Sequence, residues 1–216
     1  MADRVQTVNE EIANALTHGL GVAFCLVATP VMIGYAQKFG NPAMVWAVTV
    51  FGFGMFMVYL SSTLYHAVSQ QDAKRLLRIW DHISIFILIA GTYTPLVLKF
   101  TSASTAYIFL TIMWAVVGVG SILKIFFTGR FKVVSVMLYL ALGWMAVFII
   151  KPLWANVPSQ IWWWMLAGGL AYCFGVIFYL WKKLQYHHAV WHVFVLTGTV
   201  THFFAVYNSI PINIKA

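Results

Sequence analysis

The stretch His188-Ala189-Val190-Trp191-His192 opens the last long apolar run of this 216-residue chain. Residues four apart share one face of a helix, so these two imidazoles are expected to lie close enough to bind one metal ion. Zn²⁺ accepts histidine nitrogens at about 2.0–2.1 Å. A pair of histidines at a lipid headgroup interface fits the same pattern. The pair alone therefore leaves metal binding and interfacial placement equally open.

Composition decides the class of protein. Of the 216 residues, 62% are hydrophobic and only 8% are charged. A soluble domain of this size could not bury so much apolar surface, which predicts that the chain lies in a lipid bilayer. The net charge of +8 favours basic loops that face the cytoplasm over a nucleic-acid partner. We therefore expect an integral membrane protein that binds no nucleic acid.

Seven apolar runs each approach the roughly 20 residues that a bilayer-spanning helix needs. Turn-forming and interfacial residues separate the runs, and no soluble domain or linker is visible. Residues 1–216 are therefore predicted to form a single all-α domain, a bundle of seven transmembrane helices that follows a short cytoplasmic tail at residues 1–16. The predicted spans lie at 17–37, 43–65, 80–98, 105–126, 133–151, 161–181 and 189–210.

Lysine and arginine are distributed unevenly between the two predicted faces. Nine lie on the side of the N-terminus and four lie on the other side. Because cytoplasmic loops carry the excess of basic residues, the N-terminus is predicted to be cytoplasmic and the C-terminus outside. The nine are Arg4, Lys74, Arg75, Arg78, Lys124, Arg130, Lys132, Lys182 and Lys183, and the four are Lys38, Lys99, Lys151 and Lys215.

Several polar side chains fall at one predicted depth, near the cytoplasmic face. His66 ends the second span, Asp81 begins the third, and His188 and His192 begin the seventh. Ser62 lies one turn before His66 and on the same helix face. Three histidines and one water are the ligand set of a catalytic zinc ion. The three histidines are therefore predicted to bind Zn²⁺, with Asp81 and Ser62 as candidate catalytic residues.

Each of these residues also has a simpler interpretation. His66 alone fits an interfacial histidine, and Asp81 alone fits a helix N-cap or an ion-pair partner of Arg78. Their shared depth favours a common site, because each unpaired group would cost roughly 2–3 kcal/mol in lipid. Three roles of Asp81 stay open: fourth zinc ligand, base toward a water, and hydrogen-bond partner of a ligand imidazole.

The remaining histidines are expected to have other roles. His202 lies about 15 Å further along its helix than His192, at 1.5 Å per residue, and is expected to form hydrogen bonds inside the bundle. His187 points about 100° away from the next residue and is expected at the surface. His82 is a weak candidate for the same reason. His18 either supports the ligands or contacts lipid headgroups.

The order and spacing of these residues across separate spans resemble the hemolysin III family, the bacterial branch of the progestin and adipoQ receptor (PAQR) family. The resemblance implies a seven-helix bundle in the bacterial inner membrane, with zinc bound by His66, His188 and His192. In the relatives that bind adiponectin, a Ser and an Asp that match Ser62 and Asp81 lie around the zinc water, and ceramide hydrolysis has been attributed to the site. The residues that carry the resemblance are Glu11-Ile12-Ala13-Asn14, Thr17-His18, Ser62-x-x-x-His66, Asp81, Thr94-Pro95, His188-x-x-x-His192 and His202.

Two functions are compatible with these residues. The bacterial branch is named for a haemolytic effect and has been linked to membrane-lipid homeostasis. The long extension of the adiponectin-binding receptors is not expected here.

The first function is a zinc-dependent hydrolase whose partner is a membrane lipid, an amide or ester lipid such as a ceramide. The second is a non-enzymatic sensor, transporter or pore-forming factor with a structural zinc. Three histidines favour the first, because structural zinc normally has four protein ligands.

Overall fold

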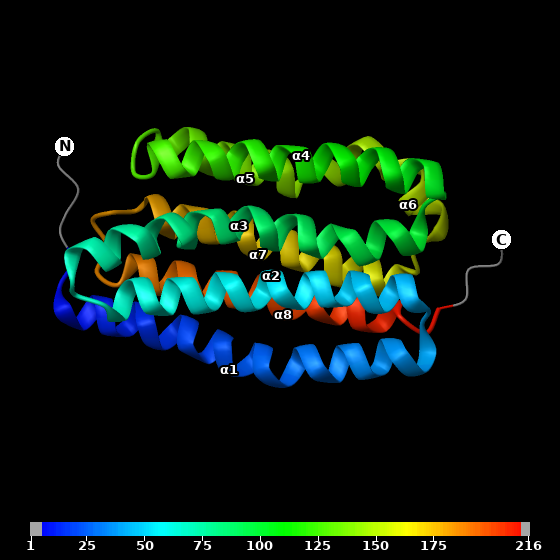
Figure 1. Cartoon of the computed structure of the whole chain (residues 1–216), viewed down its shortest axis with the longest axis horizontal. Coiled ribbons are helices and arrows are strands. Elements are labelled where there is room, and N and C mark those ends of the chain that lie inside the picture. The colour runs from blue at the N-terminus through cyan, green and yellow to red at the C-terminus, as the bar shows by residue number, and fades with distance from the viewer. Residues whose placement is uncertain (1–5, 213–216) are drawn as a thin grey trace.

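Within residues 6–212, which the computed structural model describes, seven helical segments are long and apolar enough to cross a membrane. They run side by side along one axis, and this part of the chain contains no strand (Figure 1). The predicted all-α bundle of seven spans is therefore confirmed. The helices are α1 (Val8–Phe39), α2 (Pro42–Ala67), α3 (Gln71–Phe100), α4 (Ala103–Phe127), α5 (Lys132–Gly143), the 3₁₀ helix η1 (Met145–Ile149), α6 (Ile150–Asn156), α7 (Ser159–Leu180) and α8 (His187–Ser209).

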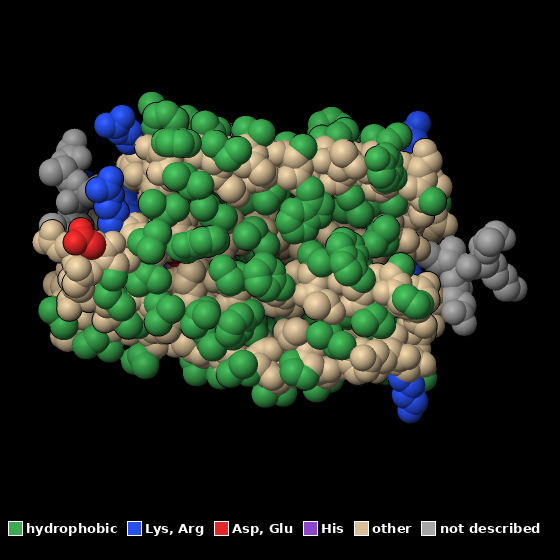
Figure 2. All heavy atoms as spheres, viewed as in Figure 1, with side chains coloured by type: hydrophobic (Ala, Val, Ile, Leu, Met, Phe, Trp, Pro, Cys, Tyr) green, Lys and Arg blue, Asp and Glu red, His purple; other side chains and the backbone are tan. Residues whose placement is uncertain are grey.

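The sides of the bundle are apolar and its ends carry charge. On the face drawn in Figure 2, hydrophobic side chains cover the middle and Lys and Arg gather at the two ends. Large apolar side chains point outward, and Tyr107 and Phe148 are 76% and 84% exposed. Such a surface is stable against acyl chains and unfavourable in water. The chain is therefore a multi-pass integral membrane protein. Arg4 and Lys215, which were counted when the orientation was predicted, lie outside the described residues.

The inner helices are α2 and α3. Helix α2 packs between α1 and α3, and α8 contacts α1, α3 and α7. Fully buried aromatic side chains fill the space between these helices, including Phe51 and Tyr59 of α2 and Phe86 of α3. This packing brings the start of α1, the end of α2 and the start of α8 together at one end of the bundle, on the left in Figure 1. We call this end the site end.

Two helices begin earlier than the sequence analysis predicted. Helix α1 begins at Val8 because Thr7 and Glu10 form a capping box, in which each side chain accepts a hydrogen bond from the backbone N–H of the other. Most of the tail expected at residues 1–16 is therefore helical, and Glu10 and Glu11 lie on the first helix. Helix α3 begins at Gln71 instead of near residue 80. Asp81 is consequently not the only acidic residue on the bundle helices.

The fifth span is broken, although the sequence analysis expected one run at 133–151. Helix α5 ends at Gly143, and the chain continues through η1 and α6 to Asn156. The Tyr93 hydroxyl donates a hydrogen bond to the Gly143 carbonyl at 2.5 Å and accepts one from the Ala146 N–H at 3.0 Å. A side chain inserted into the backbone hydrogen-bond ladder interrupts a helix in this way.

Helices α2 and α3 approach each other closely at Gly54, where a larger side chain would not fit. A Cβ at Gly54 of α2 would lie 3.1 Å from the Ile87 carbonyl oxygen and the Leu88 Cα of α3. We expect Gly54→Leu to push α2 and α3 apart and to destabilise the protein by about 1–3 kcal/mol or more. The measurement is the thermal melting temperature of the purified protein in detergent.

The matched control for this change is Gly34→Leu on α1. Gly34 is exposed, and a Cβ there would meet nothing within 4 Å. Its melting temperature should stay near that of the wild type. Equal effects of the two leucines would show that the α2–α3 approach does not limit stability.

Candidate metal centre

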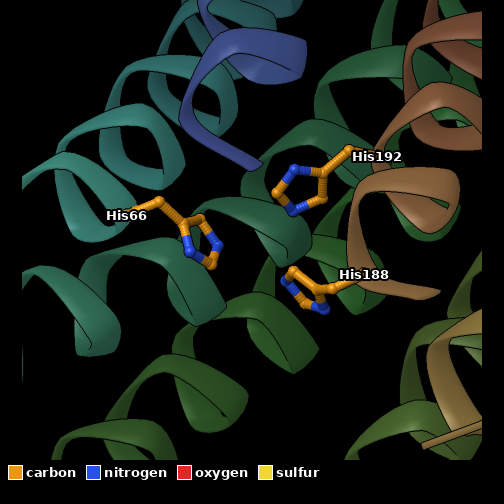
Figure 3. Close-up of side chains that lie close together, drawn as sticks. All are labelled: His66, His188 and His192. Carbon is orange, nitrogen blue, oxygen red and sulfur yellow. The ribbon is translucent and has the colours of Figure 1, made fainter. Parts of the chain in front are cut away.

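Three histidines from two helices converge at the site end. His66 lies in the last turn of α2, and His188 and His192 lie on successive turns at the start of α8 (Figure 3). One ring nitrogen of each histidine lies within 4.8 Å of the other two. The ring centroids are 4.5 Å apart for His188 and His192, and 5.1 and 5.2 Å from His66 to each of them. The structure therefore brings together the three residues that the sequence analysis predicted as metal ligands. We call them the histidine cluster.

A carboxylate of α1 fixes the orientation of His66. The Nδ1 of His66 donates a hydrogen bond to Glu11 Oε2 at 2.6 Å, and Lys74 Nζ donates to Glu11 Oε1 at 3.1 Å. With a proton on Nδ1, the lone pair lies on Nε2, which is buried and has no hydrogen-bond partner within residues 6–212. Histidines that bind metals usually donate their second N–H to a carboxylate or carbonyl, which makes the ring a better ligand.

Helix α1 also orients His192. Its Nδ1 donates a hydrogen bond to the Asn14 carbonyl oxygen at 3.1 Å, and Thr17 Oγ1 lies 3.2 Å from the same nitrogen. This arrangement leaves Nε2 of His192 with the free lone pair. The ring of His18 stacks on His192 with centroids 3.5 Å apart, and His18 is 3% exposed. His18 therefore supports a cluster histidine and does not contact headgroups.

The residues of the cluster fit the predicted zinc ion. Neutral imidazoles with an unprotonated Nε2 are donors that Zn²⁺ prefers. The buried Nε2 of His66, which has no partner among the described residues, is the kind of atom that a metal would satisfy. Within residues 6–212, the histidine cluster is the one group of three or more histidine, cysteine or acidic side chains with this geometry.

Ser62 and Asp81 lie beside the same cavity as the histidine cluster. The cavity has a volume of about 590 Å³ and extends from the cluster between α3, α5 and α7. Ser62 is 1% exposed, and its Oγ has no hydrogen-bond partner in the described part of the chain. The Asp81 side chain is 15% exposed, and its Oδ2 lies 3.6 Å from His82 Nδ1. The structure thus brings both predicted catalytic residues to one cavity with the cluster.

The carboxylate of Asp81 is not part of the ligand cluster. This position favours a role toward a water or substrate over that of fourth ligand. The N-cap interpretation of Asp81 is wrong, because the side chain of Gln70 caps α3 and Asp81 lies ten residues inside that helix. The ion-pair interpretation also fails, because Asp81 and Arg78 form no ion pair within residues 6–212, and the Asp81 carboxylate lies 3.6 Å from His82 Nδ1 instead.

The expected surface position of His187 is wrong. His187 is 4% exposed, and its Nδ1 lies 3.1 Å from the Phe178 carbonyl oxygen. The connection at residues 181–186 folds α8 back against α7, and it ends at Tyr186 with a left-handed φ of 56°. This tight return buries the first residue of α8.

His202 and His82 lie outside the cluster, as expected. His202 is within the bundle, and its Nε2 donates a hydrogen bond to the Met165 carbonyl oxygen at 3.1 Å. The Nδ1 of His82 donates to the Arg78 carbonyl oxygen of its own helix at 2.8 Å. Neither ring nitrogen belongs to the group that could hold a metal.

The supporting role of α1 was missed by the sequence analysis. No function was predicted for Glu11, Asn14 or Thr17, which contact two of the three histidines of the cluster. A signal was present, since Thr7-Val8-Asn9-Glu10 fits a capping box and predicts a helix from residue 8. On that helix the three residues would form one polar stripe that points into the bundle.

The fold and the cluster define a class: seven-span integral membrane proteins with three histidines converging at one end of a cavity. The chain belongs to the haemolysin-III-related family, whose profile matches residues 6–203. It is 42% identical to the Hemolysin-3 homolog of Bacillus subtilis (strain 168) over 200 residues, 93% of this chain and 94% of that protein. It is 43% identical to Hemolysin-3 of Bacillus cereus over 206 residues, 95% and 94% of the two chains.

A more distant relative extends the comparison. The monocyte to macrophage differentiation factor of Homo sapiens is 24% identical over 208 residues, which cover 94% of this chain and 85% of that protein. Its match over nearly the whole chain fits the placement of the chain among PAQR-type proteins. The resemblance stated from the sequence is therefore confirmed.

The hydrogen bond from His66 to Glu11 predicts the effect of Glu11→Gln. The amide oxygen is a weaker acceptor for the imidazole N–H, so zinc affinity should fall by about 10–100-fold. Competition with a chelator in detergent solution measures the affinity. Asp72→Asn is the matched control, because Asp72 is exposed at the start of α3. Unchanged affinity in Glu11→Gln would contradict a supporting role for this carboxylate.

Proposed function

We propose that this protein is a zinc-dependent hydrolase of an amide or ester lipid, similar to a ceramidase, that acts in lipid homeostasis of the bacterial inner membrane. The observation that carries the proposal is the convergence of three histidine nitrogens beside a cavity whose lining also includes Ser62 and Asp81. Because Asp81 is outside the histidine cluster, the three histidines would leave one coordination position of a zinc ion open, as in catalytic zinc sites.

The chain's own residues supply the rest of the chemistry. A zinc ion at such a site provides Lewis-acid polarisation of a carbonyl and a lower pKa for a nearby water. Asp81 accepts a proton from the water whose oxygen bonds to the scissile carbonyl carbon, and returns it to the leaving amine or alcohol as the C–N or C–O bond breaks. Ser62 Oγ, which has no partner within the described residues, donates a hydrogen bond to the substrate.

The location of the cluster suits a lipid substrate. His66 is near the end of α2 and His188 is in the first turn of α8, so the site lies close to a membrane surface. The amide or ester bonds of lipids lie at the level of their headgroups. The cavity between α3, α5 and α7 offers apolar space for an acyl chain next to the cluster.

A second candidate is a non-enzymatic membrane protein in which zinc is structural. It is favoured by the names of two relatives, Hemolysin-3 and Hemolysin-3 homolog, which refer to a haemolytic effect. In that case a fourth protein ligand would close the coordination sphere. The two candidates therefore differ in the role of Asp81.

Zinc content and hydrolysis should respond differently to substitutions. Purified protein should hold about one zinc ion, and His66→Ala or His192→Ala should lose most of it. Asp81→Asn should keep the zinc and lower the release of fatty acid from ceramides and other amide or ester lipids by about 10²–10⁴-fold. Elemental analysis and a lipid-release assay measure the two effects.

The opposite outcome would support the structural candidate. Asp81→Asn would then lose zinc and thermal stability together, because the energy of binding a structural metal is also folding energy. Wild-type protein that releases no fatty acid from any lipid of the panel, together with loss of zinc from Asp81→Asn, would end the hydrolase proposal.

The proposed cytoplasmic position of the site end can be tested with reporters. The connection at residues 68–70 should report the cytoplasm, because the site end carries most of the basic residues. A reporter between Gly40 and Asn41, at the other end of the bundle, should report the outside. Two reporters on the same side would contradict the seven-span arrangement, and exchanged sides would reverse the orientation.

A further inference from the structure

Basic side chains from separate elements line the cavity near the site end. The cavity lining contains only two acidic side chains among the described residues, Asp81 and Glu11. Glu11 already accepts hydrogen bonds from His66 and Lys74. The lining thus carries an excess of positive charge. The basic residues are Arg78 on α3, Lys124 on α4, Arg130 in the turn after α4, Lys132 at the start of α5 and Lys182 just after α7.

Lys124 is buried although lysine is ordinarily a charged residue. It is 6% exposed, its Nζ donates a hydrogen bond to Ser135 Oγ at 2.5 Å, and it lies 5.5 Å from the centre of the Tyr139 ring. No carboxylate forms an ion pair with it within residues 6–212. A buried cation without a counter-ion is unfavourable, most of all in a membrane protein. An anion bound in the cavity would offset this cost.

Arg78 and Lys182 also lack a carboxylate partner in the described part of the chain. The Arg78 guanidinium lies against Gly129, where a Cβ would come within 3.0 Å of it and where φ is +85°. Burial, and secondly the charge of Lys132, lower the pKa of Lys182 to about 8. An anion between these side chains would relieve their mutual repulsion.

The preference of cytoplasmic loops for basic residues does not explain these positions. Arg75 and Lys183 also lie at the site end and are fully consistent with that preference, since both are exposed and neither lines the cavity. Basic residues on the surface are sufficient to set the orientation of the protein in the membrane. The orientation therefore does not explain why Lys124 is buried or why Arg78 lines the cavity.

We propose that the cavity binds an anionic lipid with a phosphate in its headgroup, which Arg78, Lys124 and Lys182 hold. Lysine and arginine are the usual phosphate ligands, and basic pockets between transmembrane helices bind lipid headgroups. Deeper in the cavity the lining is apolar, with Leu88 of α3 and Leu140 of α5 among its residues. An acyl chain of the lipid lies there. A volume of about 590 Å³ is within the range of cavities that enclose a ligand.

The proposal rests on the proposed function in one point only, that the lipid bound at the cavity is the substrate of the histidine cluster. The phosphate at the basic side chains brings the ester or amide bonds of the lipid to the depth of the cluster. Binding itself requires neither zinc nor hydrolysis. The test therefore measures binding.

The experiment titrates the full-length protein, in a neutral detergent, with three probes. They are dioctanoyl phosphatidic acid, dioctanoylglycerol, which has the same acyl chains without the phosphate, and inorganic phosphate. Phosphatidic acid should bind at least about tenfold more tightly than dioctanoylglycerol, a difference equal to one charge-assisted hydrogen bond. Inorganic phosphate should compete only weakly, because it has no acyl chain.

Substitutions locate the binding site. Arg78→Gln combined with Lys182→Gln should remove the preference for phosphatidic acid, whereas Arg75→Gln combined with Lys183→Gln should keep it at the same change in net charge. The melting temperature of each variant shows that it is folded. Equal affinity for the two lipids, or equal losses in the two double variants, would overturn the proposal. Competition by inorganic phosphate as strong as that of phosphatidic acid would show a phosphate site instead of a lipid site.

The outcome is independent of the proposed function. A protein that prefers phosphatidic acid but holds no zinc and hydrolyses nothing would keep this inference and end the hydrolase proposal. Zinc-dependent hydrolysis of uncharged lipids, with no preference for phosphatidic acid, would keep the hydrolase proposal and overturn this inference.

Discussion

The site depends on hydrogen bonds that join the first helix to histidines of two other helices. Glu11 accepts a hydrogen bond from His66 of α2, and the Asn14 carbonyl accepts one from His192 of α8. The two acceptors lie three residues apart on α1, so one rigid face of this helix fixes both rings. The free nitrogens are thereby directed toward a common point without a loop that must be ordered first.

The sequence was sufficient for most of the fold and for the convergence of the three histidines. Long apolar runs reveal spans directly, and the spacing of His188 and His192 places them on one helix face. His66 was assigned to the same site because the end of the second span and the start of the seventh lie at the same depth in the bilayer. The role of Glu11 was not found, because the first turns of α1 are polar and an apolar run does not reveal them. The burial of His187 depends on the return of the chain at residues 181–186, which no periodic pattern encodes.

The break in the fifth span could not be predicted from the sequence either. It requires the hydroxyl of Tyr93, on another helix, to insert between Gly143 and Ala146. Pairings of this kind are tertiary, so a run of apolar residues looks continuous. The break matters for the site because α5 forms one wall of the cavity that leads away from the histidine cluster.

The cavity combines two kinds of surface that suit an amphipathic ligand. Its site end carries basic side chains and the histidine cluster, and its deeper part is apolar. Asp81 and Ser62 line this cavity but lie outside the cluster. We therefore propose that the three histidines hold a zinc ion with one coordination position open.

X-ray absorption at the zinc edge of the purified, zinc-loaded protein tests this claim most directly. The account predicts three imidazole nitrogens at about 2.0–2.1 Å and one further light ligand from water. A spectrum with sulfur in the first shell, or with fewer than three imidazoles, would contradict it.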